Sequence, residues 1–212
     1  QKPLREAGTY YIPELPDKAS DGKEIKVGVI GCGGRGSGAV KNVFAAADNV
    51  KIVALGDVFA DRLEKLRTNI KENYGQEVAE ENCFIGFDSY KNVIDAGVDY
   101  VICTAPPVFR PDHFKYATEK GVHSFLEKPI AVDPKGYRTV MATARQAKAK
   151  NLVVVCGTQR HHQRPYVQAY EKISQGMIGE ITGGNVYWNQ GMLWYKNREK
   201  GWSDMEWMIR DW

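Results

Sequence analysis

Short apolar runs rich in β-branched residues alternate along this chain with longer stretches in which apolar residues recur every three or four positions. The short runs predict β-strands, at residues 26–30, 51–55, 99–104, 123–126 and 152–156. The longer stretches predict helices, at residues 37–47, 60–74, 89–96, 111–120 and 134–150. Such alternation is typical of βαβ units, in which helices cover both faces of a parallel sheet. The pattern therefore predicts an α/β fold built on a doubly wound parallel sheet.

The pattern changes on both sides of this region. Residues 1–24 combine prolines with a polar stretch and predict an irregular arm. After Thr158 the sequence predicts one helix and then a strand at residues 181–190. All five tryptophans lie between residues 188 and 212, and so aromatic a segment needs a surface to cover it. We therefore divide the chain into an arm (1–24), the alternating domain (25–158) and the incomplete start of a second α/β domain (159–212).

A glycine-rich loop follows the first predicted strand. Gly31, Gly33 and Gly36 have the spacing G-x-G-x-x-G, with Gly34 and Arg35 between the last two. In a Rossmann fold these glycines make a tight turn, let a pyrophosphate approach the backbone and let the next helix pack on the sheet. That helix directs its N-terminal amides at the phosphates. Because a strand precedes the loop and a helix follows it, we predict a dinucleotide site on a Rossmann sheet, with a purely structural turn as the alternative.

Asp57 comes two residues after the second predicted strand and 21 residues beyond Gly36. A carboxylate here can accept hydrogen bonds from both hydroxyls of an adenosine ribose. A 2′-phosphate would instead bring like charges within about 4 Å, which is unfavourable by about 4 kcal/mol at an effective dielectric of about 20. Arg62 could offset this repulsion, but its position suits the outer face of the next helix. We predict NAD rather than NADP as cofactor, with a turn or helix N-cap role for Asp57 as the alternative.

Two further strand ends carry candidate residues. One reads Thr104-Ala105-Pro106-Pro107, a rigid turn that we expect to bind the cofactor through Thr104 and Pro106, with a simple loop as the alternative. The other reads Glu127-Lys128-Pro129, where two opposite charges follow a buried strand. Lys128 could stabilise a developing alkoxide, and Pro129 could hold the Lys128 backbone in a tight cis turn. The alternative for this pair of charges is a surface ion pair in a loop.

The composition of the chain limits the kinds of partner that we expect. Hydrophobic residues make up 43% and charged residues 26% of the chain, and its net charge is +3. Basic and acidic residues are well mixed, so we expect no nucleic-acid partner. No apolar run approaches the roughly 20 residues that would span a bilayer. The four cysteines form no C-x-x-C pair, so we predict neither a metal site nor a disulfide framework.

Together these residues resemble the Gfo/Idh/MocA family, which comprises glucose–fructose oxidoreductases, inositol dehydrogenases and rhizopine-catabolism proteins. The resemblance covers residues 25–212 and rests on six segments: 31–36, 104–106, 121–129, 157–160, 187–191 and 202–206. Glu127-Lys128-Pro129 is its most specific part. The last two segments look like those of an exported bacterial branch, which implies the periplasm, with the cytoplasm as the alternative.

The resemblance implies an NAD-dependent oxidoreductase that transfers hydride at a secondary alcohol or ketone carbon of a sugar, inositol or related polyol. It also implies a second domain with an open sheet that often mediates homo-oligomer formation. By the same likeness Glu127 and Lys128 bind the cofactor, Lys128 is the catalytic lysine, and Gln159 and Arg160 lie near the nicotinamide or the substrate.

The sequence departs from the family at two histidines. Members of the family usually have a histidine in the turn before the fourth helix. In this sequence Arg110 comes near that position, and His113 follows it. The family's proton-transfer histidine lies further into the second domain than Trp212. His161 and His162 could substitute for it, but substrate contact or solvent exposure is the interpretation that we favour for them. Two other functions share the same motifs: an NAD-dependent glycoside hydrolase of this superfamily, or a nucleotide-binding fragment that is inactive by itself.

Overall fold

The computed structural model describes residues 22–193 and 195–212. The chain divides into two units, of which one ends at Thr158 and the other includes residues 159–212. Most of the predicted arm, residues 1–21, lies outside the described residues. The two units are described separately below.

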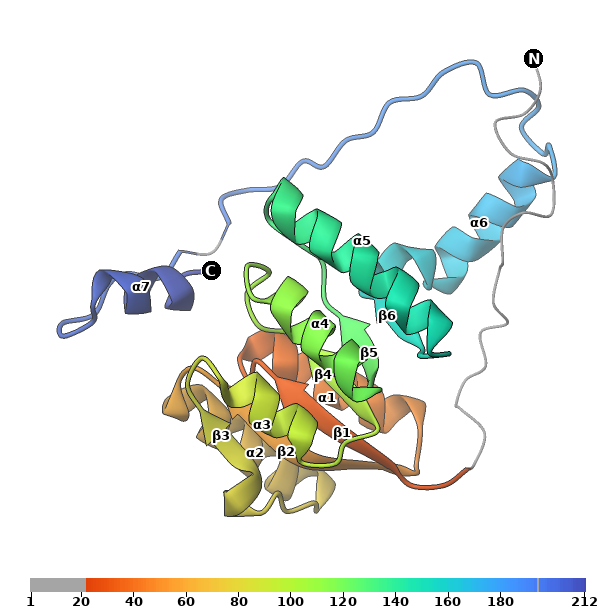
Figure 1. Ribbon diagram of the computed structural model, residues 1–212. Helices are drawn as coiled ribbons and strands as arrows, with labels where there is room; N and C mark the ends of the chain where they lie inside the picture. The colour runs from red at the N-terminus through yellow and green to blue at the C-terminus, as the bar shows by residue number, and fades with distance from the viewer. Residues whose placement is uncertain (1–21, 194) are drawn as a thin grey trace. The chain divides into compact units, whose positions relative to one another are not determined.

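A six-stranded sheet forms the centre of the unit that ends at Thr158 (Figure 1). Its strands are β1 (Ile25–Ile30), β2 (Val50–Asp57), β3 (Cys83–Ile85), β4 (Tyr100–Cys103), β5 (His123–Leu126) and β6 (Val154–Cys156). They lie in the order β3-β2-β1-β4-β5-β6, and every neighbouring pair is parallel. The chain reverses its direction of winding between β1 and β4, which is where open parallel sheets of this kind bind ligands.

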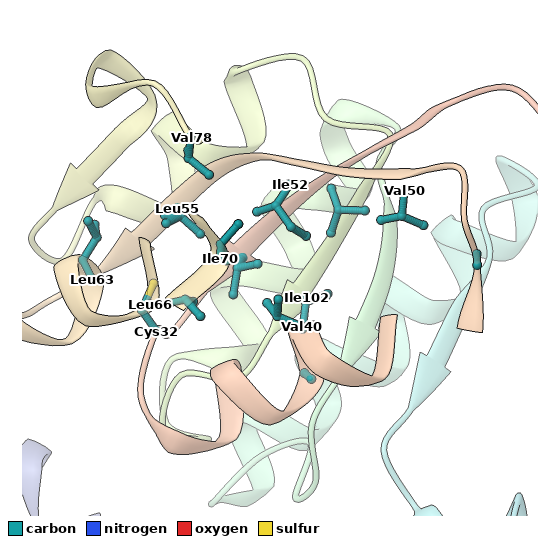
Figure 2. Close-up of a cluster of buried hydrophobic side chains, with 14 residues drawn as sticks. Cys32, Val40, Val50, Ile52, Leu55, Leu63, Leu66, Ile70, Val78 and Ile102 are labelled. Carbon is teal, nitrogen blue, oxygen red and sulfur yellow. The ribbon is translucent and has the colours of Figure 1, made fainter. Parts of the chain in front are cut away.

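Helices cover both faces of this sheet: α1 (Gly34–Ala46), α2 (Ala60–Tyr74), α3 (Ser89–Asp95), α4 (Arg110–Lys120) and α5 (Pro134–Ala149). The helix α2 illustrates why they form. Leu63, Leu66 and Ile70 recur at helical spacing and are completely buried. They pack with residues of α1, β1 and β2 in the cluster that Figure 2 shows. A second buried cluster, with residues of α3, α4 and α5, includes Phe114 and lies on the opposite face.

The predicted elements of this unit are confirmed, mostly to within a few residues. Strand β5 and helix α2 have the predicted bounds. The sequence did not predict β3, nor the short 3₁₀ helix η1 (Glu80–Asn82) before it. A three-residue edge strand is too short for alternation to distinguish it from a loop.

The second unit contains η2 (Gln159–His161), α6 (Arg164–Ser174) and α7 (Asp204–Arg210). The prediction of a strand at residues 181–190 is wrong, because these residues form no regular element. A strand needs a partner for its backbone groups, and here even Val186 is 98% exposed. Helix α7 was not predicted, although Ser203 and Glu206 have the capping-box spacing; the Ser203 side chain accepts a hydrogen bond from the Glu206 amide.

Two negative findings apply to the described residues. None of their helices is both long enough and apolar enough to cross a membrane. Nor do any three of their His, Cys, Asp or Glu side chains gather where they could hold a metal ion.

Candidate cofactor site

Five residues form a row across the carboxyl edge of the sheet. The strands β2, β1, β4, β5 and β6 reach the same level, because their registers align Gly56, Ile30, Cys103, Leu126 and Cys156. The residue that directly follows each of these five forms a row, which we call the edge row. Its members are Asp57, Gly31, Thr104, Glu127 and Gly157. The backbone amides of the last four donate to carbonyls of neighbouring strands, at 2.8 to 3.0 Å. Motifs that lie far apart in the sequence therefore lie side by side.

Two glycines of the loop are required by close backbone contacts. Gly31 has a φ of +94°, and a Cβ there would lie 2.3 Å from the Ala105 nitrogen. A Cβ on Gly36 would lie 2.0 Å from the carbonyl oxygen of Gly31. Any side chain at either position would force the backbone apart. These glycines thus let α1 begin directly against the end of β1.

The middle of the loop is open. A Cβ on Gly33 would have as its nearest heavy atom Arg62 Cδ, at 3.9 Å, and a Cβ on Gly34 would meet nothing within 4 Å. Gly33 is the N-cap of α1, and no side chain caps this helix. The amides of its first turn lack acceptors within the helix and carry the positive end of its dipole. This opening between bare amides fits the pyrophosphate of a dinucleotide.

Asp57 is buried and already accepts two backbone hydrogen bonds. Its Oδ2 accepts from the Cys32 amide at 2.6 Å, and its Oδ1 accepts from the Phe59 amide at 2.9 Å. Burial raises the pKa of Asp57, and these two bonds oppose that rise. The N-cap of α2 is Phe59, so the N-cap alternative for Asp57 is wrong, whereas its turn role is real. Each carboxylate oxygen retains a second lone pair for a ribose hydroxyl.

Arg62 does not lie on the outer face of α2, where we expected it from the sequence. Its side chain is half-buried, and its stem is the nearest neighbour of Gly33. Its guanidinium lies 5.2 Å from the centre of the Phe59 ring, and its charge works to lower the pKa of Asp57. The expectation of an outward-facing Arg62 is therefore wrong, and a positive charge stands near the proposed ribose carboxylate.

Thr104 and Pro106 shape the turn after β4. The Thr104 hydroxyl lies 2.7 Å from the Gly31 carbonyl oxygen, which accepts its hydrogen bond. The Pro106 carbonyl accepts from the Phe109 amide at 3.1 Å, just before α4. Thr104 thus ties its turn to the glycine loop, and Pro106 begins the connection to α4.

Glu127 links the start of α1 to the end of β5. Its Oε1 accepts from Arg35 Nε at 2.5 Å, and its Oε2 accepts from the Lys128 amide at 2.6 Å. The Glu127 side chain is only 10% exposed, so the two adjacent charges do not form the alternative surface pair. The Lys128 side chain is exposed, and among the described residues no ion pair engages it. The Lys128–Pro129 peptide bond is cis, as predicted.

Gln159 and Arg160 belong to the second unit and are not part of the edge row. Both lie in η2 and are exposed. Arg160 Nε donates to the Tyr166 hydroxyl at 3.1 Å, and its guanidinium lies 4.6 Å from the centre of the Trp188 ring. His161 and His162 are exposed in the same segment.

This strand order, with an uncapped helix N-terminus at the point where the winding reverses, defines a dinucleotide-binding Rossmann domain. Residues 25–157 match the sequence model of the Gfo/Idh/MocA family, described as an oxidoreductase family with an NAD-binding Rossmann fold. The chain belongs to this family. The predicted family, Rossmann sheet and NAD cofactor are thereby confirmed.

Similar proteins extend this finding. A scyllo-inositol 2-dehydrogenase (NAD(+)) of Bacillus subtilis is 28% identical over 159 residues, which are 74% of this chain and 42% of that protein. A glycosyl hydrolase family 109 protein of Streptomyces coelicolor is 24% identical over 87% of this chain and 38% of its own length. A crystal structure of scyllo-inositol dehydrogenase from Lactobacillus casei with bound NAD(H) and scyllo-inositol has a TM-score of 0.61. It is 28% identical and covers 76% of this chain and 44% of its own. The chain thus spans about two fifths of the length of these relatives.

Proposed function

We propose that this chain forms the NAD-binding part of an oxidoreductase that acts on a polyol, with inositols as the first substrates to test. The observation that carries the proposal is the placement of Lys128. This exposed amine directly follows Glu127, whose carboxylate is bonded to Arg35 in the first turn of α1. The phosphate cradle and the lysine thus share one edge of one sheet. Similarity to inositol dehydrogenases supports the substrate class.

Each group has a proposed task in this reaction. Bound NAD would supply the hydride acceptor. The amides at Gly33 and Gly34 would hold its pyrophosphate, and Asp57 would accept from its adenosine ribose. The Lys128 ammonium would donate to the substrate oxygen and stabilise the negative charge that develops there as the hydroxyl proton passes to solvent water.

Two measurements test this proposal. Calorimetric titration of the chain with NAD should show binding, and Gly33→Val should abolish it by filling the cradle. Absorbance at the NADH band should then rise when the full-length protein is mixed with NAD and either scyllo-inositol or myo-inositol. Absence of NAD binding by a folded chain would refute the cofactor site, whereas binding without turnover of any polyol would refute only the substrate assignment. The fragment alternative predicts that binding persists in this chain while turnover requires further sequence.

A glycoside hydrolase is the second candidate. The family 109 relative of Streptomyces coelicolor aligns over 186 residues, more of this chain than the Bacillus subtilis dehydrogenase covers. Both functions would use the same cradle and the same lysine. Release of nitrophenol from nitrophenyl glycosides without accumulation of NADH would favour the hydrolase and contradict net oxidation.

We further propose that the whole protein is a homo-oligomer and lies in the bacterial periplasm. Exposed apolar side chains of the second unit, such as Val186 and Met192, support an additional contact surface there. Light scattering of the full-length protein tests the first point, and fractionation of cells tests the second.

A further inference from the structure

Arg110 lies beneath two turns of the cofactor site. It is the first residue of α4 and only 2% exposed. Its Nη2 donates to the Ala105 carbonyl at 2.6 Å, and its Nη1 donates to the Pro129 carbonyl. One guanidinium therefore joins the turn after β4 to the turn that carries Lys128.

Packing alone does not account for this arginine. Burial lowers its pKa, and its Nε is a buried donor without a partner among the described residues. A buried charge with an unpaired N–H opposes folding, and apolar side chains of similar volume often replace buried charged groups without loss of stability. What an apolar side chain cannot supply is a planar fork that donates to two carbonyls at once.

The contact with the Pro129 carbonyl matters because Pro129 directly follows Lys128 in the chain. The Lys128 side chain is exposed, so only its backbone is fixed by contacts. On one side its amide donates to Glu127 at 2.6 Å, and on the other the Pro129 carbonyl accepts from Arg110. The other arm of Arg110 holds Ala105, whose amide donates to the Ile30 carbonyl at 3.1 Å, just before the glycine loop.

We propose that Arg110 is a positioning residue, which fixes the Lys128 turn relative to the glycine loop and so sets where the lysine amine meets the bound cofactor and substrate. This inference rests on the function proposed for Lys128. It assigns to Arg110 a part in turnover rather than in cofactor affinity, because Arg110 contacts neither the open cradle at Gly33 and Gly34 nor Asp57.

The test compares three variants of the full-length protein. Arg110→Met keeps the unbranched stem of the side chain but removes the guanidinium and all its donors, and Arg110→Lys restores a charge that can reach a carbonyl. Ala117→Gly, in the buried middle of α4, serves as a control that weakens the same helix away from the turns. With inositol as substrate, kcat of Arg110→Met should fall about ten- to a hundredfold, since displacing a reacting group by about 1 Å has effects of that size. Its Kd for NAD should stay within about threefold of the wild-type value.

The outcomes separate the hypotheses. Partial recovery of kcat in Arg110→Lys, with a normal kcat in Ala117→Gly, supports the positioning role. An unchanged kcat in Arg110→Met overturns it, as does an equal loss in Ala117→Gly at equal thermal stability. If the wild-type protein turns over no polyol, amide hydrogen exchange of residues 125–131 decides instead. Faster exchange there in Arg110→Met than in Ala117→Gly supports the tethering of the turn, and equal exchange overturns it.

Discussion

The second and third glycines of the loop can be separated by experiment, because one serves the ligand and the other the fold. A Cβ on Gly36 would lie 2.0 Å from the backbone oxygen of Gly31, which cannot move aside without distorting the end of β1. A Cβ on Gly33 would have no heavy atom nearer than 3.9 Å. Gly36→Ala should therefore destabilise the protein, whereas Gly33→Ala should leave the fold intact and obstruct the cofactor.

The contacts set the size of both effects. Overpacking of a close-packed site is unfavourable by about 1–3 kcal/mol, and a clash with backbone places Gly36→Ala near about 3 kcal/mol. In a protein of about this size 1 kcal/mol shifts Tm by about 2–4 °C, so Tm should fall by roughly 6–12 °C. Gly33→Ala should change stability by less than about 0.5 kcal/mol. Loss of one hydrogen bond to a charged phosphate, about 1.5–3 kcal/mol, raises the Kd for NAD about ten- to a hundredfold.

Thermal unfolding followed by circular dichroism, together with calorimetric titration of NAD, measures both effects. Gly38→Ala is the matched control, because its Cβ would lie 3.4 Å from Arg35 Nη1, an ordinary contact, and alanine is more favourable than glycine in a helix interior. Its Tm should equal or exceed that of the wild type, with normal NAD binding. A wild-type Tm for Gly36→Ala would refute the close contact between α1 and β1. A wild-type Kd for Gly33→Ala would refute the placement of the pyrophosphate.

Three further predictions concern single side chains. Burial lowers the pKa of His113 to about 3, so its neutral form stabilises the fold above pH 6.5, and this stability is lost as the pH falls from there towards 3. The free energy of unfolding of the wild type, measured in urea, should therefore fall by about 2 kcal/mol more between pH 7 and pH 5 than that of His113→Phe. Asp57→Ala should weaken NAD binding, relax discrimination against NADP, and lower stability by about 1–3 kcal/mol because the buried Cys32 amide loses its acceptor. Lys128→Ala should lower kcat of the full-length protein far more than it changes the Kd for NAD.

Each of these predictions has a contradicting result. Parallel pH profiles for wild type and His113→Phe would mean that His113 titrates normally in the folded state. An unchanged ratio of NAD to NADP affinity in Asp57→Ala would refute the ribose role, whatever the change in stability. Full turnover in Lys128→Ala would refute the catalytic role of the lysine.

Local sequence signals were sufficient for much of the fold. The apolar period in residues 60–74 and the run at residues 123–126 gave α2 and β5 their observed bounds. The same reasoning failed at residues 181–190, where a β-like run has no partner strand among the described residues. Strand formation depends on hydrogen bonds to another segment, whereas a helix satisfies its backbone locally. The capping-box spacing of Ser203 and Glu206 is such a local signal, and the helix α7 does form there.

Residue spacing and strand ends are local properties of the chain, so the sequence was enough to predict the Rossmann sheet and the candidates Gly31, Gly33, Asp57 and Lys128. How those candidates come together depends on packing between segments that lie far apart in the chain. The register of five strands places Gly31 and Asp57 in the edge row, with Gly33 and Lys128 close to it in the chain, and burial turns Glu127 towards Arg35 rather than towards solvent. Arg110 shows most clearly what local sequence cannot predict. A charged residue at a helix start resembles any surface arginine in the sequence, and only the packing of α4 under two turns makes it a buried tether.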